Sequence, residues 1–254
     1  MEKIPANVLR AATVALLVMS ALVIVVGYPS IPDPMPVHYA GADPSTVQDR
    51  SWWSALFLPV LGGVALVLSV LLCTDARRST DPQPVRDGRG VAVPYSPAMA
   101  GRQREQIKAV NLGWSWLALG FAVGVAYAGP VAVLPALAPA SRLSLPVIVV
   151  ATFLGLLKML NLVVATGRRV RAEAEPDLEE VQRAEALGEE KKVFRLGAFY
   201  YNRLDPMPIV KARRQPDAME FNYAHGPGRR FLWSLLAVFV VVAAVVVIPT
   251  FTTM

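Results

Sequence analysis

The sequence predicts an all-α polytopic membrane protein with five transmembrane helices. Hydrophobic residues make up 54% of the chain and charged residues only 17%, whereas an ordinary soluble domain is about a quarter charged. Five apolar segments are nearly free of charge, and each approaches the roughly 20 helical residues that cross a hydrocarbon core. One cysteine and two histidines exclude a disulfide framework and a Cys- or His-rich metal centre, so we expect no metal and no cofactor.

The apolar segments set the predicted domain boundaries. Residues 1–74 form a two-helix membrane unit with a Pro-rich outer loop at 28–51. Residues 75–104 are rich in Pro, Gly and charge and are predicted to be a flexible cytoplasmic linker. The remaining parts are a second two-helix unit at 105–166, a cytoplasmic segment at 167–230 and the last transmembrane helix at 231–254.

The positions of Lys and Arg predict the orientation. Seven basic residues lie between 75 and 108 and thirteen between 167 and 230, whereas the opposite loops hold one each, Arg50 and Arg142. Because basic loops are retained inside, the N-terminus is predicted to be cytoplasmic and the C-terminus outside. The first span follows a basic N-terminal segment but lacks a small-x-small cleavage site, so we interpret it as an uncleaved signal anchor instead of a cleaved signal peptide.

The segment 167–230 is the candidate for a folded unit outside the membrane. Residues 173–190 contain eight acids and one arginine, which predicts an acidic helix. Nine basic and three acidic residues between 191 and 230 give a net charge of +6. Strand-forming residues at 193–201 and 219–223 flank a stretch rich in turn formers and predict a small β-hairpin.

Lys158 is the one charged residue well inside a predicted span. Asn161 follows at i+3 and lies on the same helix face. A mid-span lysine costs about 2.5–3.5 kcal/mol and usually faces a bundle interior or cavity. Two interpretations stay open: an anion, proton-relay or paired site, or a lysine that snorkels toward Arg168. No Asp or Glu lies inside any span.

The outer loop concentrates unusual residues. Five prolines between 28 and 44 favour an extended, polyproline-like backbone with few hydrogen bonds. Asp33, His38 and Asp43 are spaced five apart and would suit a cation site or an acid–base role for His38. We favour the simpler interpretation, in which His38 bonds to loop backbone and the aspartates cap turns.

Two motifs resemble bacterial domains of unknown function. The pattern Tyr-Pro-x-Ile-Pro-x-x-Met-Pro-x-His-Tyr at 28–39, with Trp52 and Trp53 opening the next span, resembles the N-terminal domain of SdpI-type immunity proteins. In that family Gly-x-Pro-Asp usually follows, whereas the sequence at 41–44 inverts the last two residues. The pattern Phe-Tyr-Tyr-Asn-x-x-Asp-Pro at 199–206 is similar to a short cytoplasmic domain that often accompanies the first.

The resemblances imply a multi-pass protein of the bacterial plasma membrane that is not an enzyme and has an immunity-type or signalling role. We expect the outer loop to bind an extracellular peptide or envelope protein, and the basic module to bind a protein, other membrane subunits or anionic lipid headgroups. The expected contact residues are Asp33, His38, Tyr39, Tyr200, Tyr201, Asn202, Asp205, Lys211 and Asn222.

A transporter, or an accessory subunit of a transport complex, is the alternative, and it would use Lys158 and Asn161. Catalysis is not expected, because no phosphate loop, nucleophile–base pair or metal-ligand motif occurs. Nucleic acid is not an expected partner, because positive-inside topology and anionic lipid explain basic residues beside a membrane.

Overall fold

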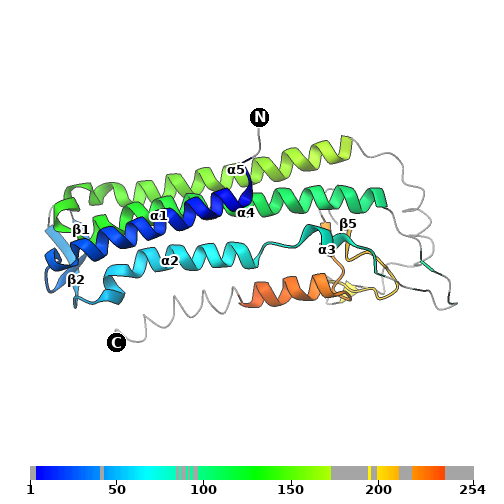
Figure 1. The fold of residues 1–254 in the computed structure, drawn as a ribbon, viewed down its shortest axis with the longest axis horizontal. Coiled ribbons are helices and arrows are strands. Elements are labelled where there is room, and N and C mark those ends of the chain that lie inside the picture. Colours follow the sequence, from blue (N-terminus) through cyan, green and yellow to red (C-terminus); the bar gives the residue numbers. More distant parts are fainter. Residues whose placement is uncertain are drawn as a thin grey trace. The chain divides into compact units, whose positions relative to one another are not determined.

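The computed structural model (Figure 1) describes residues 4–40, 43–83, 86, 90, 92–93, 97–172, 194–195, 199–211 and 219–237. Within these residues four helices are long and apolar enough to cross a membrane, which indicates a multi-pass membrane protein. The predicted fifth span begins within the helical residues 226–237, and the rest of it lies outside the described residues. The count of five spans and their orientation stay predictions.

The chain divides into two compact units, residues 1–70 with 111–162 and residues 71–110 with 163–254. Two long helices, α4 and α5, contribute to both units. The elements of the first unit are α1 (Ala6–Gly27), the 3-10 turn η1 (Tyr28–Ser30), β1 (Met35–Ala40), β2 (Asp43–Gln48), α2 (Trp52–Leu71), the second part of α4 (Pro97–Val133), the 3-10 helix η2 (Pro135–Leu143) and most of α5 (Ser144–Ala172).

In the first unit α4 is the central helix. Half of the residues in its most apolar stretch are buried, whereas only 6% are buried in the corresponding stretch of α5. Leu17 of α1 packs with Ala122 and Val125 of α4, so apolar side chains join the two helices. A second buried cluster joins the helix ends to the outer loop and consists of Ile24, Ile31, Met35, Ala55, Val133 and Leu134.

The helices α4 and α5 approach each other backbone to backbone. A Cβ atom placed on Gly124 would lie 2.6 Å from Ile148 Cα, and one on Gly155 would lie 2.7 Å from the Trp116 carbonyl oxygen. Both opposing atoms belong to the backbone and cannot rotate away. Glycine therefore permits this close approach, as small residues do between membrane helices generally.

The outer loop contains a β-hairpin, where we predicted polyproline-like backbone with few hydrogen bonds. Strand β1 pairs antiparallel with β2 from Met35 opposite Gln48 to Ala40 opposite Asp43, with register shifts around His38. Prolines are compatible with this ribbon because each strand of a two-stranded sheet has a free edge, where no N–H is needed. Met35, the first residue of β1, is fully buried in the cluster with Ile31 and Leu134, an apolar contact that loop composition alone does not indicate.

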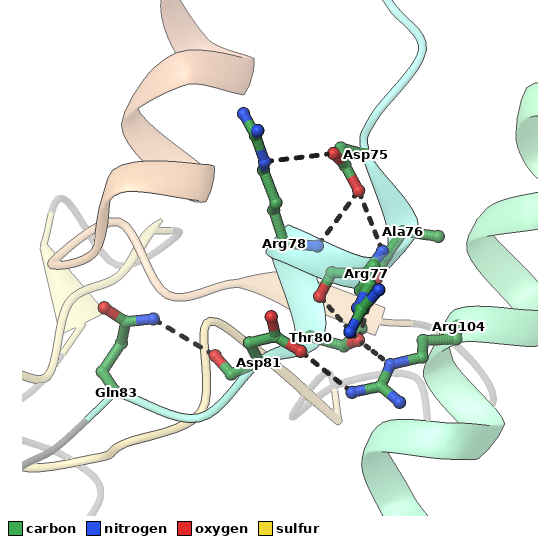
Figure 2. A network of polar contacts seen from close by, with 8 residues as sticks. All are labelled: Asp75, Ala76, Arg77, Arg78, Thr80, Asp81, Gln83 and Arg104. Carbon is green, nitrogen blue, oxygen red and sulfur yellow. Dashed lines mark hydrogen bonds and ion pairs between the residues drawn. The ribbon is translucent and has the colours of Figure 1, made fainter.

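The second unit contains short elements around the first part of α4 and the end of α5. They are α3 (Ala76–Thr80), β3 (Phe194–Arg195), β4 (Phe199–Tyr200), β5 (Ile209–Lys211), β6 (Met219–Phe221) and the helical residues 226–237. The Asp75 carboxylate accepts the N–H groups of Arg77 and Arg78, both at 3.0 Å, and so caps α3 (Figure 2). Helices thus occupy 76–80 and 97–104, both inside the predicted linker.

The predicted single hairpin is instead two separate ones. Strand β3 pairs with β4, and β5 pairs with β6. The intervening residues 202–208 do not form one tight turn, because Asn202 and Asp205 each bond to the backbone N–H two residues on and reverse the chain locally. The predicted acidic helix at 173–190 lies outside the described residues.

Candidate functional site

The structure brings together four of the predicted contact residues in one buried polar cluster. Tyr200, Asn202, Asp205 and Asn222 are between 0 and 8% exposed. They belong to residues 199–211 and 219–225, which we call the C-terminal module. Hydrogen bonds join Asn222 to Asn202, which lies 20 residues earlier in the sequence, and to Asp205, which lies 17 residues earlier.

Asn222 is the centre of this cluster. Its Oδ1 accepts the backbone N–H groups of Asn202 at 3.0 Å and Ala224 at 3.2 Å. Its Nδ2 donates to the carbonyl oxygens of Asn202 at 2.8 Å, Met207 at 3.3 Å and Asp205 at 3.4 Å. Because buried backbone groups need partners, this one amide connects both segments of the module.

Asp205 is equally well satisfied. Its Oδ2 accepts the Tyr200 hydroxyl at 2.9 Å, and its Oδ1 accepts the Met207 N–H at 2.9 Å. The His225 Nε2 lies 2.6 Å from the Asp205 carbonyl oxygen; since a carbonyl only accepts, Nε2 donates in this bond. The carboxylate, phenol and amides are bonded to one another, an arrangement suited to holding a loop in one shape.

A different set of side chains lies at the surface of the module. Arg203 is exposed, donates to the Tyr201 hydroxyl at 3.3 Å and lies 5.9 Å from the centre of its ring. Leu204 is 42% and Phe199 38% exposed. Aromatic, apolar and cationic groups are therefore available to a partner, whereas the buried amides are not.

Burial, followed by the charge of Glu220, raises the pKa of the Tyr223 hydroxyl. The folded module therefore favours the protonated phenol. Its contribution to stability is fully present below the ordinary phenol pKa of about 10 and is lost as pH rises through the raised value. This group does not make the module pH-sensitive near neutrality.

The module is attached to the first part of α4. Gln103 is 4% exposed and donates from Nε2 to the Ile209 carbonyl oxygen at 2.9 Å. Ala100 joins a buried cluster with Tyr200, Met207 and Val210. Gln103 was not among the predicted contact residues, although its position between Ala100 and Ile107, at helical spacing, marks the buried face of the helix.

The segment after α3 is held between α4 and the module. Arg104 of α4 donates from Nε to Thr80 Oγ1 at 2.7 Å and pairs through Nη2 with Asp81 at 3.0 Å (Figure 2). A few residues on, the Gln83 N–H donates to the Pro206 carbonyl oxygen at 2.6 Å. These bonds connect the module to the start of the predicted linker.

The base of the outer hairpin is a second candidate site. Arg50 donates from Nη1 to the Ile31 carbonyl oxygen at 2.8 Å, and its N–H donates to Asp33 Oδ1 at 3.3 Å. The Tyr28 ring stacks on the Trp52 ring, with their centres 3.6 Å apart, and the Arg50 guanidinium carbon lies 5.8 Å from the centre of the Tyr28 ring. Neither Arg50 nor Tyr28 was among the predicted contact residues, yet both connect the two ends of the loop.

Arg50→Ala should loosen this hairpin without unfolding the helices. The variant loses one charged hydrogen bond and one cation–π contact, which at a partly exposed site amount to about 1–2 kcal/mol. We expect faster amide hydrogen exchange in 28–48 and unchanged exchange in α4. Exchange measured by mass spectrometry on the protein in nanodiscs tests this; equal protection in both proteins would show that Arg50 does not fix the loop.

The other predicted residues are placed as follows. Asp33 is exposed, and Lys158 and Asn161 are exposed on α5. The side chains of His38, Tyr39, Asp43 and Lys211 lie outside what the structure describes. Among the described residues no three His, Cys, Asp or Glu side chains gather to hold a metal ion.

The comparisons with known proteins bear on the N-terminal motif. The family described as a domain of unknown function (DUF1648) matches residues 15–63, which include the hairpin and parts of α1 and α2. Neither curated proteins nor solved structures gave a match. The match supports similarity to a domain of unknown function, and it extends neither to SdpI-type identity nor to the C-terminal motif.

Proposed function

We propose that the protein is a non-enzymatic binding scaffold of the bacterial plasma membrane, with an immunity-type or signalling role. The outer hairpin would recognise an extracellular peptide or envelope protein. The C-terminal module would face the cytoplasm and bind a protein, a further membrane subunit or anionic headgroups. Basic residues concentrated in 75–108 and 167–230 support this orientation.

One observation carries the proposal: the C-terminal module bonds Tyr200, Asp205 and Asn222 to one another or to its own backbone, while Arg203, Leu204 and Phe199 are exposed at its surface. Asp205, Tyr200 and Asn222 are each occupied by bonds within the module. An active site, by contrast, keeps a nucleophile or base within reach of substrate. Exposed Arg203 and the half-buried Tyr201 ring are of the residue types that are enriched at protein interfaces.

The transporter alternative depends on Lys158 and Asn161. Both are exposed on α5, and a transport path through this chain alone would need them to line a cavity inside the bundle. No observation therefore favours a transporter of this chain alone. An accessory role beside another membrane protein is consistent with the same exposure.

Photo-crosslinking in native membranes tests the scaffold. A photoreactive residue at exposed Pro32 or Leu204 should yield protein adducts, whereas one at Val67, an exposed position on α2, should yield lipid adducts. Substituting Asp33→Ala and His38→Ala together should reduce the adduct at 32 by about fivefold or more, since a contact residue that matters costs about 1 kcal/mol or more when truncated. Lipid adducts alone at Pro32 would refute the outer-hairpin part of the proposal, and lipid adducts alone at Leu204 would leave anionic headgroups as the partner of the module.

A further inference from the structure

One side of α5 is exposed along its length and carries two polar residues. Val150, Leu154, Lys158 and Asn161 follow one another at intervals of three or four and are all exposed. The adjacent side packs on α4 through Ile148 and Gly155. The exposed stripe, Val150 to Asn161, is therefore a continuous apolar face with a cation and an amide on it.

The Lys158 ammonium is held at mid-span and does not reach the basic end of the helix. Side chains on an α-helix lean toward its N-terminus, which for α5 is at Ser144, about 21 Å from Lys158. The Nζ lies 5.8 Å from the centre of the Trp116 ring. Trp116 in turn has its carbonyl against Gly155, on the N-terminal side of Lys158. This geometry favours a fixed intramembrane cation over snorkelling toward Arg168.

Within the part of the chain that the structure describes, Lys158 has no counter-ion at that level. Among the described residues Lys158 forms no ion pair, and the apolar parts of α1, α2, α4 and α5 contain no Asp or Glu. The C-terminal segment 221–254 contains none either. A second copy would bring the same acid-free spans. The cation–π contact orients the ammonium but does not neutralise it.

We propose that the exposed stripe of α5 docks a transmembrane helix of another membrane protein that carries an Asp or Glu at mid-span. Leu154 and Val150 would pack against its apolar side chains, Lys158 would pair with the carboxylate, and Asn161 would hydrogen-bond beside it. Polar residues inside membranes generally pair in this way. The inference adds an intramembrane partner to the proposed scaffold and does not depend on what the hairpin or the C-terminal module binds.

Fluorescence energy transfer in phosphatidylcholine vesicles tests the proposal with a defined probe. The full chain is labelled at its single cysteine, Cys73, and the probe is a labelled leucine–alanine transmembrane peptide with Glu or Leu at its centre. The Glu peptide should associate at about three- to tenfold lower peptide-to-lipid ratio than the Leu peptide. Lys158→Met should abolish the difference, and Lys158→Arg should retain it. Leu154→Met, a change on the same face, is the matched control.

The variants keep the test decisive. Lys158→Met removes a charge from an apolar face and so is compatible with membrane folding, and Lys158→Arg keeps the charge. Equal association of the two peptides with the native chain would overturn the proposal, as would a Glu preference that persists in Lys158→Met. In vesicles that also contain phosphatidylglycerol, enrichment of this lipid around the native chain, lost in Lys158→Met and accompanied by no Glu preference, would assign the lysine to a lipid headgroup and also overturn the proposal.

Discussion

Replacing Asn222 by aspartate should unfold the C-terminal module while leaving the membrane helices intact. The substitution keeps the shape of the side chain but replaces the Nδ2 donor by an oxygen. That oxygen would face the carbonyls of Asn202, Met207 and Asp205, the nearest 2.8 Å away. Asn222 is fully buried, so the new oxygen has neither solvent nor a donor, and only the other carboxylate oxygen keeps the N–H groups of Asn202 and Ala224. The expected loss of stability is about 3–5 kcal/mol.

Hydrogen exchange of the module in nanodiscs measures this effect. We expect the amides of 199–211 to exchange near the unfolded rate in Asn222→Asp, while α4 residues after 110 keep their protection. Arg203→Ala is the matched control, because Arg203 is exposed and its bond to Tyr201 should contribute about 0–1 kcal/mol. Full protection of the module in Asn222→Asp would contradict the central role of this amide.

The membrane helices were predictable because an absence of charge over about 20 residues has one main physical explanation. Their ends were not, since hydropathy reports the membrane-embedded part only. The predicted second two-helix unit begins at residue 105, whereas α4 runs from Pro97 to Val133. The extension toward Pro97 is polar on one side and apolar on the other, and its buried face is fixed by Gln103 and its contact with Ile209.

The residues of the candidate site could be predicted from the sequence, but their arrangement in space could not. The motif at 199–206 directed attention to Asn202 and Asp205, and its resemblance to a short cytoplasmic domain led to the expectation that they face a partner. Their inward orientation depends on Asn222, which is 17 to 20 residues away. Local propensity carries no information about such a pairing. Likewise, the sequence put Lys158 inside a span, and its exposure follows only from how α5 packs on α4.

Gly155→Leu should separate α4 from α5 and strongly destabilise the first unit. The added Cβ would lie 2.7 Å from the Trp116 carbonyl oxygen and 3.2 Å from Leu117 Cα, and neither atom can move without shifting the helix. Over-packing commonly costs about 1–3 kcal/mol, and we expect about 3 kcal/mol or more because the opposing atoms are backbone. The loss should appear as a lower temperature at which the monodisperse detergent-solubilised protein aggregates.

Gly63→Leu provides the control for this experiment. Gly63 lies in α2, also a membrane helix, but a Cβ there meets nothing within 4 Å. The same change in side chain should therefore be nearly neutral or slightly stabilising, because leucine has a higher helix propensity than glycine. Equal losses in the two variants would mean that added bulk on any membrane helix is the cause. A loss confined to Gly155→Leu would establish that the close approach of α5 to α4 at Gly155 fixes how α5 packs, and with it the exposure of Lys158.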